Sequence, residues 1–308
     1  MTLRQLYEEG RDYLLKHGVP EAELSARLLL CEAFSMSAGE YLFSCERELS
    51  ELYDKSSLSG LLEDYSTYLA LRGRRVPIQQ ILGRTQFMGL DFAVSPDVLI
   101  PRQDTETLVE QVLYDYPRQD IRVLDMCTGS GCIAASLAVL GGYRQVVGAD
   151  ISMEALEIAQ GNALRLLREA ERREDEYRQE IRFARTDLFR GITGVMEELG
   201  IDSFDVIVSN PPYIRTADIE ELEPEVRDFE PRLALDGSYD GLHFYRRIAA
   251  EAGPYLQAGG SLYLEIGADE AEDVKKILEA AGFEEIRVIR DLADKGRVIR
   301  ARKPCTED

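Results

Sequence analysis

The sequence predicts an α/β protein in which a small helical domain precedes a larger domain built on a parallel sheet. Three observations predict this fold class. Apolar residues in the first 75 positions recur at intervals of three and four, which is the period of a helix. From Pro101 onward, short apolar runs alternate with helical patterns, as is typical of parallel βαβ units. A segment rich in glycines and strand-forming residues separates these two sequence patterns.

The helical domain is expected at residues 1–75, and a linker is expected at residues 76–100. Helical spacing is clearest at Leu3, Leu6 and Tyr7, at Ala26, Leu29 and Leu30, and at Leu58, Leu61, Leu62, Tyr65 and Leu69. In the linker, Gly83, Gly89 and Pro96 stand among residues that favour strands, such as Phe87 and Phe92. This combination of turn-forming and strand-forming residues predicts a β-hairpin.

The remaining residues, 101–308, are expected to form the α/β domain. Strands are expected at residues 121–125, 145–150, 181–186, 204–209 and 261–266. Helices are expected at residues 105–114, from Cys132 onward, and at 153–168, 242–256 and 269–281. Two further strands are expected at residues 285–290 and 297–301, and they should form a terminal hairpin. The run 168–180 is dense in charges of both signs, which predicts the solvated end of a surface helix.

The composition argues against several classes of function. The 308 residues include 36 Lys and Arg against 57 Asp and Glu, and the net charge of −21 repels phosphate backbones, so direct binding of nucleic acid is not expected. The five cysteines form no Cys-x-x-Cys pair and the two histidines lack companion ligands, so neither a disulfide framework nor a metal site is expected. No apolar stretch approaches the length of a bilayer span, which predicts a cytoplasmic protein without a membrane partner.

The loop Asn210-Pro211-Pro212-Tyr213 directly follows an expected strand and predicts a site for a planar amide or amine. Two prolines have fixed φ and no N–H, so the loop is stiff and the carbonyls around it stay available as acceptors. Asn210 adds a side-chain acceptor and donor, and Tyr213 adds an aromatic face. The alternative interpretation is a plain turn at the end of a strand, because Asn-Pro and Pro-Pro are common in loops.

A second loop, residues 125–131 (DMCTGSG), follows a strand and opens a helix, where open α/β sheets bind ligands. Its glycines allow close approach of the backbone, and Asp150 at the end of the next strand can accept hydrogen bonds from ribose hydroxyls. The same spacing also satisfies the dinucleotide fingerprint of dehydrogenases. Asp125 favours S-adenosylmethionine, because a carboxylate opposes a pyrophosphate and suits a sulfonium and an ammonium group.

The ends of four expected strands carry Asp125, Asp150, Asp187 and Asn210. If the ligand runs across neighbouring strand ends, Asp187 would lie near an adenine amino group, although a turn or helix-capping aspartate is an equal alternative. Because the four ends would form one crevice, the functional interpretation of the Asn210 loop is favoured over a plain turn.

Five motifs in this order resemble the PrmC (HemK) family of protein-glutamine N5-methyltransferases, which modify peptide-chain release factors. They are residues 77–83 (PIQQILG), 100–106 (IPRQDTE), 125–131 (DMCTGSG), 210–213 (NPPY), and Phe229-Glu230-Pro231 with Ala234-Leu235. The resemblance covers essentially the whole chain. It implies a Rossmann-like, seven-stranded class I S-adenosylmethionine-dependent methyltransferase domain, a small N-terminal helical bundle and a short β linker.

The resemblance also implies the substrate and the site. The substrate would be the side-chain amide of the glutamine in the Gly-Gly-Gln motif of class-one release factors, with S-adenosyl-L-methionine as donor and S-adenosyl-L-homocysteine as product. The donor would be lined by Cys127, Thr128, Gly129, Ser130, Gly131 and Asp150, its adenine flanked by Asp187 and Leu188, with Asn210 alongside. The glutamine would be held by Asn210, Pro211, Pro212 and Tyr213, with Phe87 packed on it. Many family members have glycine in place of Cys127, and this small side chain is expected to be accommodated.

Asn210, Pro211 and Tyr213 are the expected catalytic residues. An amide nitrogen is a poor nucleophile because its lone pair is delocalised into the carbonyl. If the Asn210 side-chain oxygen and the Pro211 carbonyl each accept one substrate N–H, the lone pair can be directed at the methyl group. The helical domain is expected to contact the release factor, and a monomer is the default expectation.

Three other functions remain open from the residues. An adenine-N6 methyltransferase of DNA or RNA would use the same loop for an exocyclic amine, although the net charge disfavours it. A glutamine methyltransferase of a ribosomal protein is a closer alternative. A non-catalytic adaptor would use the α/β domain only as a scaffold, which an intact cofactor loop disfavours.

Overall fold

The chain is divided into two compact units in the computed structural model, which describes residues 1–117, 120–171, 180–291 and 293–305. The helical unit comprises Met1–Gly83 and Glu223–Phe229, and the catalytic unit comprises Arg84–Leu222 and Glu230–Asp308. The helical unit therefore ends at Gly83 rather than at residue 75. It also includes Glu223–Phe229, which lies within the range expected for the α/β domain.

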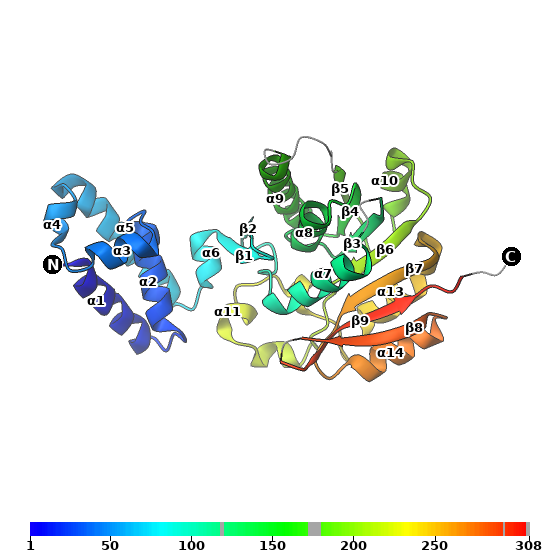
Figure 1. The fold of residues 1–308 in the computed structure, drawn as a ribbon. Helices are drawn as coiled ribbons and strands as arrows, with labels where there is room; N and C mark the ends of the chain where they lie inside the picture. Colours follow the sequence, from blue (N-terminus) through cyan, green and yellow to red (C-terminus); the bar gives the residue numbers. More distant parts are fainter. Residues whose placement is uncertain (118–119, 172–179, 292, 306–308) are drawn as a thin grey trace. The chain divides into compact units, whose positions relative to one another are not determined.

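The helical unit is built from helices (Figure 1), and their apolar faces form a main core and a smaller cluster around Leu14 and Ala26. The helices are α1 (Leu3–Lys16), α2 (Ala22–Ala33), α3 (Ala38–Ser44), α4 (Leu49–Leu52), α5 (Lys55–Gly73) and α6 (Ile78–Leu82). Local sequence sets their starts: Thr2 and Ser37 form capping boxes with Gln5 and Glu40, and Asp54 caps α5. Their buried side chains include Leu3, Leu29, Leu30 and Tyr65.

The returning segment Glu223–Phe229 is held to the helical unit by charged and polar contacts. It carries α11 (Pro224–Arg227). Glu225 accepts from Arg72 at 2.9 Å and from Arg75 at 2.5 Å, and its side chain is only 17% exposed. The Gln80 side chain donates to the Phe229 carbonyl at 2.9 Å. Because these partners are about 150 residues apart in sequence, no local pattern predicts their association.

The catalytic unit contains a seven-stranded sheet of order β5-β4-β3-β6-β7-β9-β8. Its strands are β3 (Arg122–Met126), β4 (Gln145–Asp150), β5 (Glu180–Arg185), β6 (Phe204–Ser209), β7 (Leu256–Glu265), β8 (Glu284–Arg290) and β9 (Gly296–Arg302). Neighbouring strands from β5 through β4, β3 and β6 to β7 are parallel, whereas β9 is antiparallel to β7 and to β8. The expected parallel core and terminal hairpin are both confirmed.

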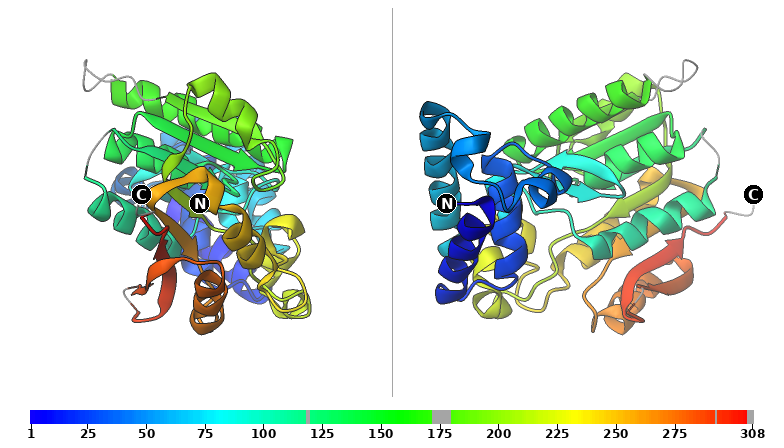
Figure 2. Two further views of the ribbon diagram at one scale, coloured as in Figure 1. Left: turned by 90° about the vertical axis from the view of Figure 1, so that its right-hand side faces the viewer. Right: turned by 60° about the vertical axis from the view of Figure 1, so that its left-hand side comes forward.

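Helices cover both faces of this sheet, as the two views of Figure 2 show. One core joins the sheet to α7 (Gln103–Asp115), α8 (Cys132–Gly141) and α9 (Met153–Glu171). The other joins it to α10 (Ile192–Leu199), α13 (His243–Glu251) and α14 (Ala271–Ala280). Along β3, Val123 enters the first core and Leu124 the second, because successive strand side chains point to opposite faces. Burial on both sides explains the continuous apolar runs of the parallel strands.

The linker differs from the hairpin expected over residues 76–100. The short helix α6 comes first, and the hairpin is confined to β1 (Arg84–Phe87) and β2 (Leu90–Ala93). Met88 and Gly89 form its two-residue turn, with φ of 52° and 72°. Positive φ at both positions is the geometry that matches the twist of paired strands.

Other differences have local causes. Helix α10 was not expected: it has eight residues between Gly191 and Gly200, too few for a clear helical period. The helix expected over 242–256 ends at Glu251 because Gly253 and Pro254 follow, in a 3-10 turn (Gly253–Tyr255). The surface-helix prediction for the run 168–180 lies largely outside the described residues, although α9 extends to Glu171.

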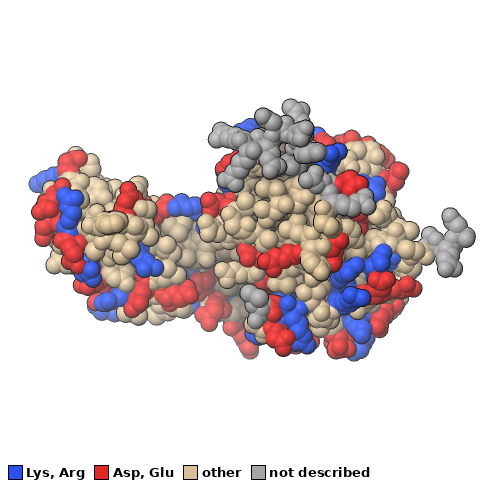
Figure 3. Space-filling view, viewed as in Figure 1, with Lys and Arg blue, Asp and Glu red and all other residues tan. Residues whose placement is uncertain are grey.

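Charges of both signs are interspersed on the face of the catalytic unit shown in Figure 3. Arginines of β8 and β9 gather there, and four of them form ion pairs. These are Arg290 with Asp294, Arg297 with Asp291, Arg300 with Asp115, and Arg302 with Glu285. In the described parts of the chain, no helix is both long and apolar enough to cross a membrane.

Candidate active site

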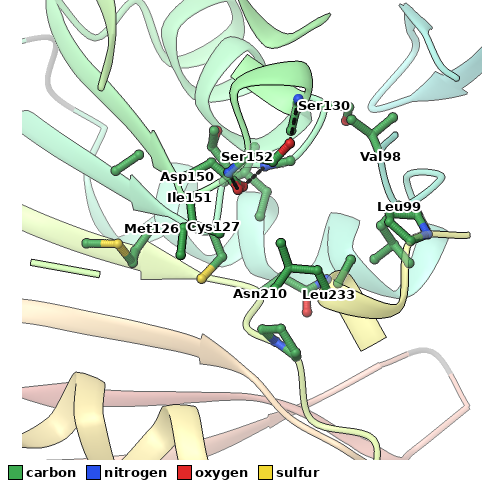
Figure 4. A pocket seen from close by; sticks show the side chains of 18 of the residues that line it. Val98, Leu99, Met126, Cys127, Ser130, Asp150, Ile151, Ser152, Asn210 and Leu233 are labelled. Carbon is green, nitrogen blue, oxygen red and sulfur yellow. Dashed lines mark hydrogen bonds between the residues drawn. The ribbon is translucent and has the colours of Figure 1, made fainter. Parts of the chain in front are cut away.

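A cavity of about 270 Å³ opens in the catalytic unit where β3, β4, β5 and β6 end. Because these strands are neighbours in the order β5-β4-β3-β6, the residues after each strand reach one crevice. Asp150, Asp187 and Asn210 line it from three of those strand ends, and Cys127 to Ser130 line it from the fourth. Figure 4 shows Cys127, Asp150 and Asn210 around the same space. Three of the four predicted strand-end side chains are thus brought together.

The glycine-rich loop after β3 depends on backbone conformations that side chains disfavour. Cys127, Gly129 and Gly131 have φ of 62°, 53° and 75°. A Cβ placed on Gly131 would lie 2.9 Å from the Cβ of Ala159, so α9 approaches the loop too closely for any side chain. The Thr128 N–H donates to the Ala149 carbonyl at 3.0 Å, which ties the loop to β4.

Asp125 lies beneath this loop rather than on the cavity wall. Its Oδ2 accepts from the Thr128 hydroxyl at 2.6 Å and from the Ala134 N–H at 3.0 Å, and its Oδ1 is buried with no hydrogen-bond partner among the described residues. Burial raises the pKa of Asp125 to about 7, and the charge of Asp150 adds to the rise. The expectation that Asp125 faces the ligand is therefore not met, because its carboxylate braces the loop and the start of α8.

Asp150 does face the cavity, held by two backbone donors. Its Oδ2 accepts from the Gly129 N–H at 2.9 Å and its Oδ1 from the Ser152 N–H at 3.0 Å, as Figure 4 illustrates. Each carboxylate oxygen retains a further lone pair. The side chain can therefore accept two more hydrogen bonds from a ligand without reorienting.

Asp187 and Leu188 lie at the next strand end and also line the cavity. Asp187 is in a turn, since its carbonyl accepts from the Arg190 N–H at 3.1 Å. Its carboxylate pairs with Arg247 of α13 at 2.7 Å. The turn interpretation is correct for the backbone, and the predicted adenine contact stays a prediction.

The Asn210 loop is fixed by its neighbours. The Asn210 amide donates from Nδ2 to the Thr105 hydroxyl of α7 at 3.3 Å. Backbone pairing of Ile214 with Leu235 and Gly237 holds the loop from the other side, at 3.0 and 2.8 Å. A Cβ on Gly237 would lie 2.7 Å from the Tyr213 Cα, so this approach requires glycine. The stiffness expected from the two prolines is thus reinforced by packing.

The four residues of the loop are not equally exposed to the cavity. Asn210 and Pro212 line it, whereas Pro211 and Tyr213 do not. The Tyr213 hydroxyl donates to Oε1 of the buried Glu265 at 3.4 Å, and burial raises the pKa of Tyr213. Tyr213 therefore supports the loop from behind, and its predicted contact with a flat ligand stays a prediction.

Phe87, which was expected to pack on the substrate, does not line the cavity, and that contact stays a prediction. Phe87 is 1% exposed and packs edge-on against Phe92, with ring centroids 6.0 Å apart. Both belong to the core beneath α7 and α8. An aromatic residue in a linker is as well suited to core packing as to a ligand, and its sequence pattern does not distinguish the two.

One residue on the cavity wall and its buried partner were missed. Arg102 lines the cavity and its Nη2 contacts both oxygens of Glu230, at 2.8 and 2.7 Å. The Glu230 side chain is buried, and burial raises its pKa to about 7 although Arg102 opposes the rise. Both residues lie in motifs that carried the family resemblance, but the sequence alone gave them no role.

Two cysteines lie at the glycine-rich loop and the start of α8. Cys127 and Cys132 are both free thiols, and burial raises the pKa of each. Their thiols therefore stay protonated near neutral pH. Among the described residues, no group of three or more His, Cys, Asp or Glu side chains could hold a metal ion.

The order of the sheet, the reversed strand β9 and the glycine-rich loop after β3 together define a class I methyltransferase fold. A solved structure of the hMettl16 catalytic domain in complex with MAT2A 3′UTR hairpin 1 has this fold in common. The TM-score is 0.52 at 14% identity, covering 78% of this chain and 81% of that one. Family models for the PrmC N-terminal domain and the methyltransferase small domain match residues 5–83 and 103–223.

Two relatives extend the similarity over nearly the whole chain. The release factor glutamine methyltransferase of Geobacter sulfurreducens is 40% identical over 98% of this chain and 96% of its own. That of Koribacter versatilis is 38% identical over 99% of this chain and 100% of its own. The chain belongs to the family of release factor glutamine methyltransferases and is, as such, a methyltransferase.

Proposed function

We propose that this enzyme transfers a methyl group from S-adenosyl-L-methionine to the side-chain amide of the glutamine in the Gly-Gly-Gln motif of class-one peptide-chain release factors. The observation that carries the proposal is that Asp150, the glycine-rich loop and Asn210 border one cavity. A donor held by the first two would present its methyl group beside an acceptor of amide N–H groups. Membership of the family supports the same reaction.

The residues at the cavity fit this donor. The two oxygens of Asp150 have lone pairs for both ribose hydroxyls, and the loop lets a ligand approach its backbone because Gly129 and Gly131 lack side chains. The acidic side chains at the strand ends suit a cationic donor. Arg102 adds one positive charge on the cavity wall, where it could pair with the carboxylate of the donor. Asp187 and Leu188 are proposed to flank the adenine.

Asn210 is proposed to orient the glutamine amide. Its Nδ2 already donates to Thr105, which leaves Oδ1 to accept one N–H of the substrate, and the Pro211 carbonyl is the proposed second acceptor. Two fixed acceptors would hold both hydrogens in their plane and direct the nitrogen lone pair out of it. When bound, the donor supplies a methyl group on a sulfonium and leaves as the neutral S-adenosyl-L-homocysteine. An alkylated amide nitrogen is acidic, so no strong base is needed.

The helical unit is proposed to contact the release factor. A monomeric state, a cytoplasmic location and the absence of a direct nucleic-acid partner stay predictions.

The test is methyl transfer from labelled donor to purified release factor, ribosomal proteins, DNA and RNA, run in parallel with the Asn210→Ala variant. Labelling of the release factor by the native enzyme and its loss in the variant are expected. Labelling of ribosomal protein or nucleic acid alone would reject the proposed substrate. Failure of the native enzyme to bind the donor by calorimetry would reject the proposed reaction.

A further inference from the structure

Two consecutive residues of the chain are held by side chains of different units. Phe229 is the last residue of the returning segment in the helical unit, and its carbonyl accepts from the Gln80 side chain of α6 at 2.9 Å. Glu230 is the first residue back in the catalytic unit, and its two carboxylate oxygens accept from Nη2 of Arg102 at 2.8 and 2.7 Å. Phe229 and Glu230 together form a junction, where the chain passes from one unit to the other.

The chain is well anchored on both sides of the junction. The Glu230 side chain is 1% exposed. Earlier in the returning segment, Glu225 accepts from Arg72 at 2.9 Å and from Arg75 at 2.5 Å, and the Arg72 side chain is 7% exposed. Separation of such a buried pair would leave an uncompensated charge, which is strongly destabilising. The returning segment is therefore a fixed part of the helical unit up to the junction.

The wall of the cavity begins directly after the junction, with the short helix α12 (Arg232–Leu235). The residues of this stretch that line the cavity are Pro231, Leu233 and Ala234. Figure 4 shows Leu233 facing the same space as Asn210. The far end of α12 is tied to the chain beyond the Asn210 loop, where the Ile214 N–H donates to the Leu235 carbonyl at 3.0 Å. The near end of the wall is set at the junction.

The junction has no slack, because its two residues are joined by one peptide bond. Consecutive Cα atoms are held about 3.8 Å apart across a trans peptide, so a shift of Phe229 is passed to Glu230 and to the wall that follows. Loss of the hydrogen bond from Gln80 would give the near end of the wall more freedom. A ligand that packs on the wall would then have to restrict that freedom again on binding.

We infer that Gln80, acting through the junction, is a positioning residue that fixes the cavity wall, so that a residue of the helical unit controls affinity at the cavity. The inference rests on the proposed function for the identity of the ligand, S-adenosyl-L-methionine. It gives the residues 77–83, which carried the family resemblance without a role of their own, a task at the cavity. It also gives a protein bound to the helical unit a route to the donor, because coupling between two sites is reciprocal.

The test removes the Gln80 amide and keeps the rest of α6. Gln80→Met has a similar length and no N–H donor, whereas Gln80→Lys keeps a donor. The matched control is Gln79→Met, at the neighbouring position of α6 and outside the junction. Both glutamines are half-buried, so the two methionine variants change the surface to a similar extent.

Hydrogen exchange read by mass spectrometry reports the wall directly. The Ala234 N–H donates to the Pro231 carbonyl at 2.8 Å, and the Asp236 N–H donates to the Arg232 carbonyl at 3.0 Å. In the absence of ligand, Gln80→Met should raise deuterium uptake at these amides and leave uptake of the glycine-rich loop native. Gln80→Lys and Gln79→Met should both stay near native. A rise over the whole catalytic unit would show general loosening and would overturn the inference.

Calorimetry with S-adenosyl-L-methionine supplies the functional readout. Gln80→Met should raise the donor dissociation constant about 2- to 12-fold, the factor that corresponds to one ordinary hydrogen bond. Gln80→Lys should recover most of the affinity, and Gln79→Met should keep all of it. Native donor affinity in Gln80→Met, or native uptake in α12, would overturn the inference and leave the proposed function standing. If the variants behave as expected and the native enzyme methylates no release factor, the inference is upheld and the proposed function fails.

Discussion

Replacement of Asp150 by asparagine is the sharpest test of the donor site, because it changes charge and one atom while it preserves shape. Both oxygens of Asp150 accept a backbone N–H, from Gly129 at 2.9 Å and from Ser152 at 3.0 Å. Asparagine has only one oxygen, so its NH2 group must face one of these two donors. In either orientation, one backbone N–H and one side of the ligand site lose their acceptor.

The expected magnitude follows from the bonds that are lost. A hydrogen bond to a charged acceptor contributes about 1.5–3 kcal/mol, so loss of one ribose contact should raise the donor dissociation constant roughly 10- to 150-fold. The unpaired backbone N–H should lower the free energy of unfolding by about 1–3 kcal/mol. The two effects are separable, because the first needs the donor and the second does not.

Isothermal titration calorimetry with S-adenosyl-L-methionine measures the first effect, and denaturant unfolding without ligand measures the second. Asp218→Asn is the matched control, since that half-exposed side chain lies in the 3-10 turn Asp218–Glu221 and its ion pair with Arg215 is long, at 3.9 Å. It should leave both quantities native. A native dissociation constant in folded Asp150→Asn would refute the assignment of Asp150 to the donor ribose.

Three further predictions concern the loops and the buried carboxyl groups. Asn210→Ala should lose most of kcat on release factor while donor affinity falls less, and near-native turnover would contradict the amide clamp. Gly131→Ala should lower both donor affinity and the free energy of unfolding, because φ at Gly131 is 75° and the added Cβ would lie 2.9 Å from Ala159. The control, in both calorimetry and unfolding, is Gly161→Ala, where an added Cβ would have nothing within 4 Å. Burial raises the pKa of Glu265 from 4.5 to about 7, so the folded state keeps a proton there that the unfolded chain has released, and stability falls as pH rises between those values. Relative to Glu265→Gln, the native protein should lose on the order of 3 kcal/mol from pH 4 to pH 8 in denaturant unfolding, and a constant difference would show that the carboxyl has an ordinary pKa.

The sequence predicted the parallel core of the catalytic unit well because its signals are local. Strands buried on both faces require continuous apolar runs, and these are visible at residues 146–149 and 206–208. Strand ends in such a sheet meet at one edge, so the positions of Asp150 and Asn210 after two such runs are enough to predict that they lie together.

The missed features depend on contacts between distant segments. Glu225 joins the helical unit through Arg72 and Arg75, about 150 residues away. Side-chain direction was equally unpredictable from the sequence. Asp150 ends β4 and faces the cavity, whereas Asp125 is the residue before the last one of β3 and is held beneath the loop by Thr128 and Ala134.

The most direct measurement of the central claim is peptide fragmentation mass spectrometry of release factor after incubation with the enzyme and S-adenosyl-L-methionine. One methyl group on the side-chain nitrogen of the glutamine in the Gly-Gly-Gln motif is predicted. A release factor with glutamate at that position has no amide nitrogen and should stay unmodified. A methyl group on any other residue, or an unmodified native release factor under conditions where donor binding is demonstrated, would contradict the claim.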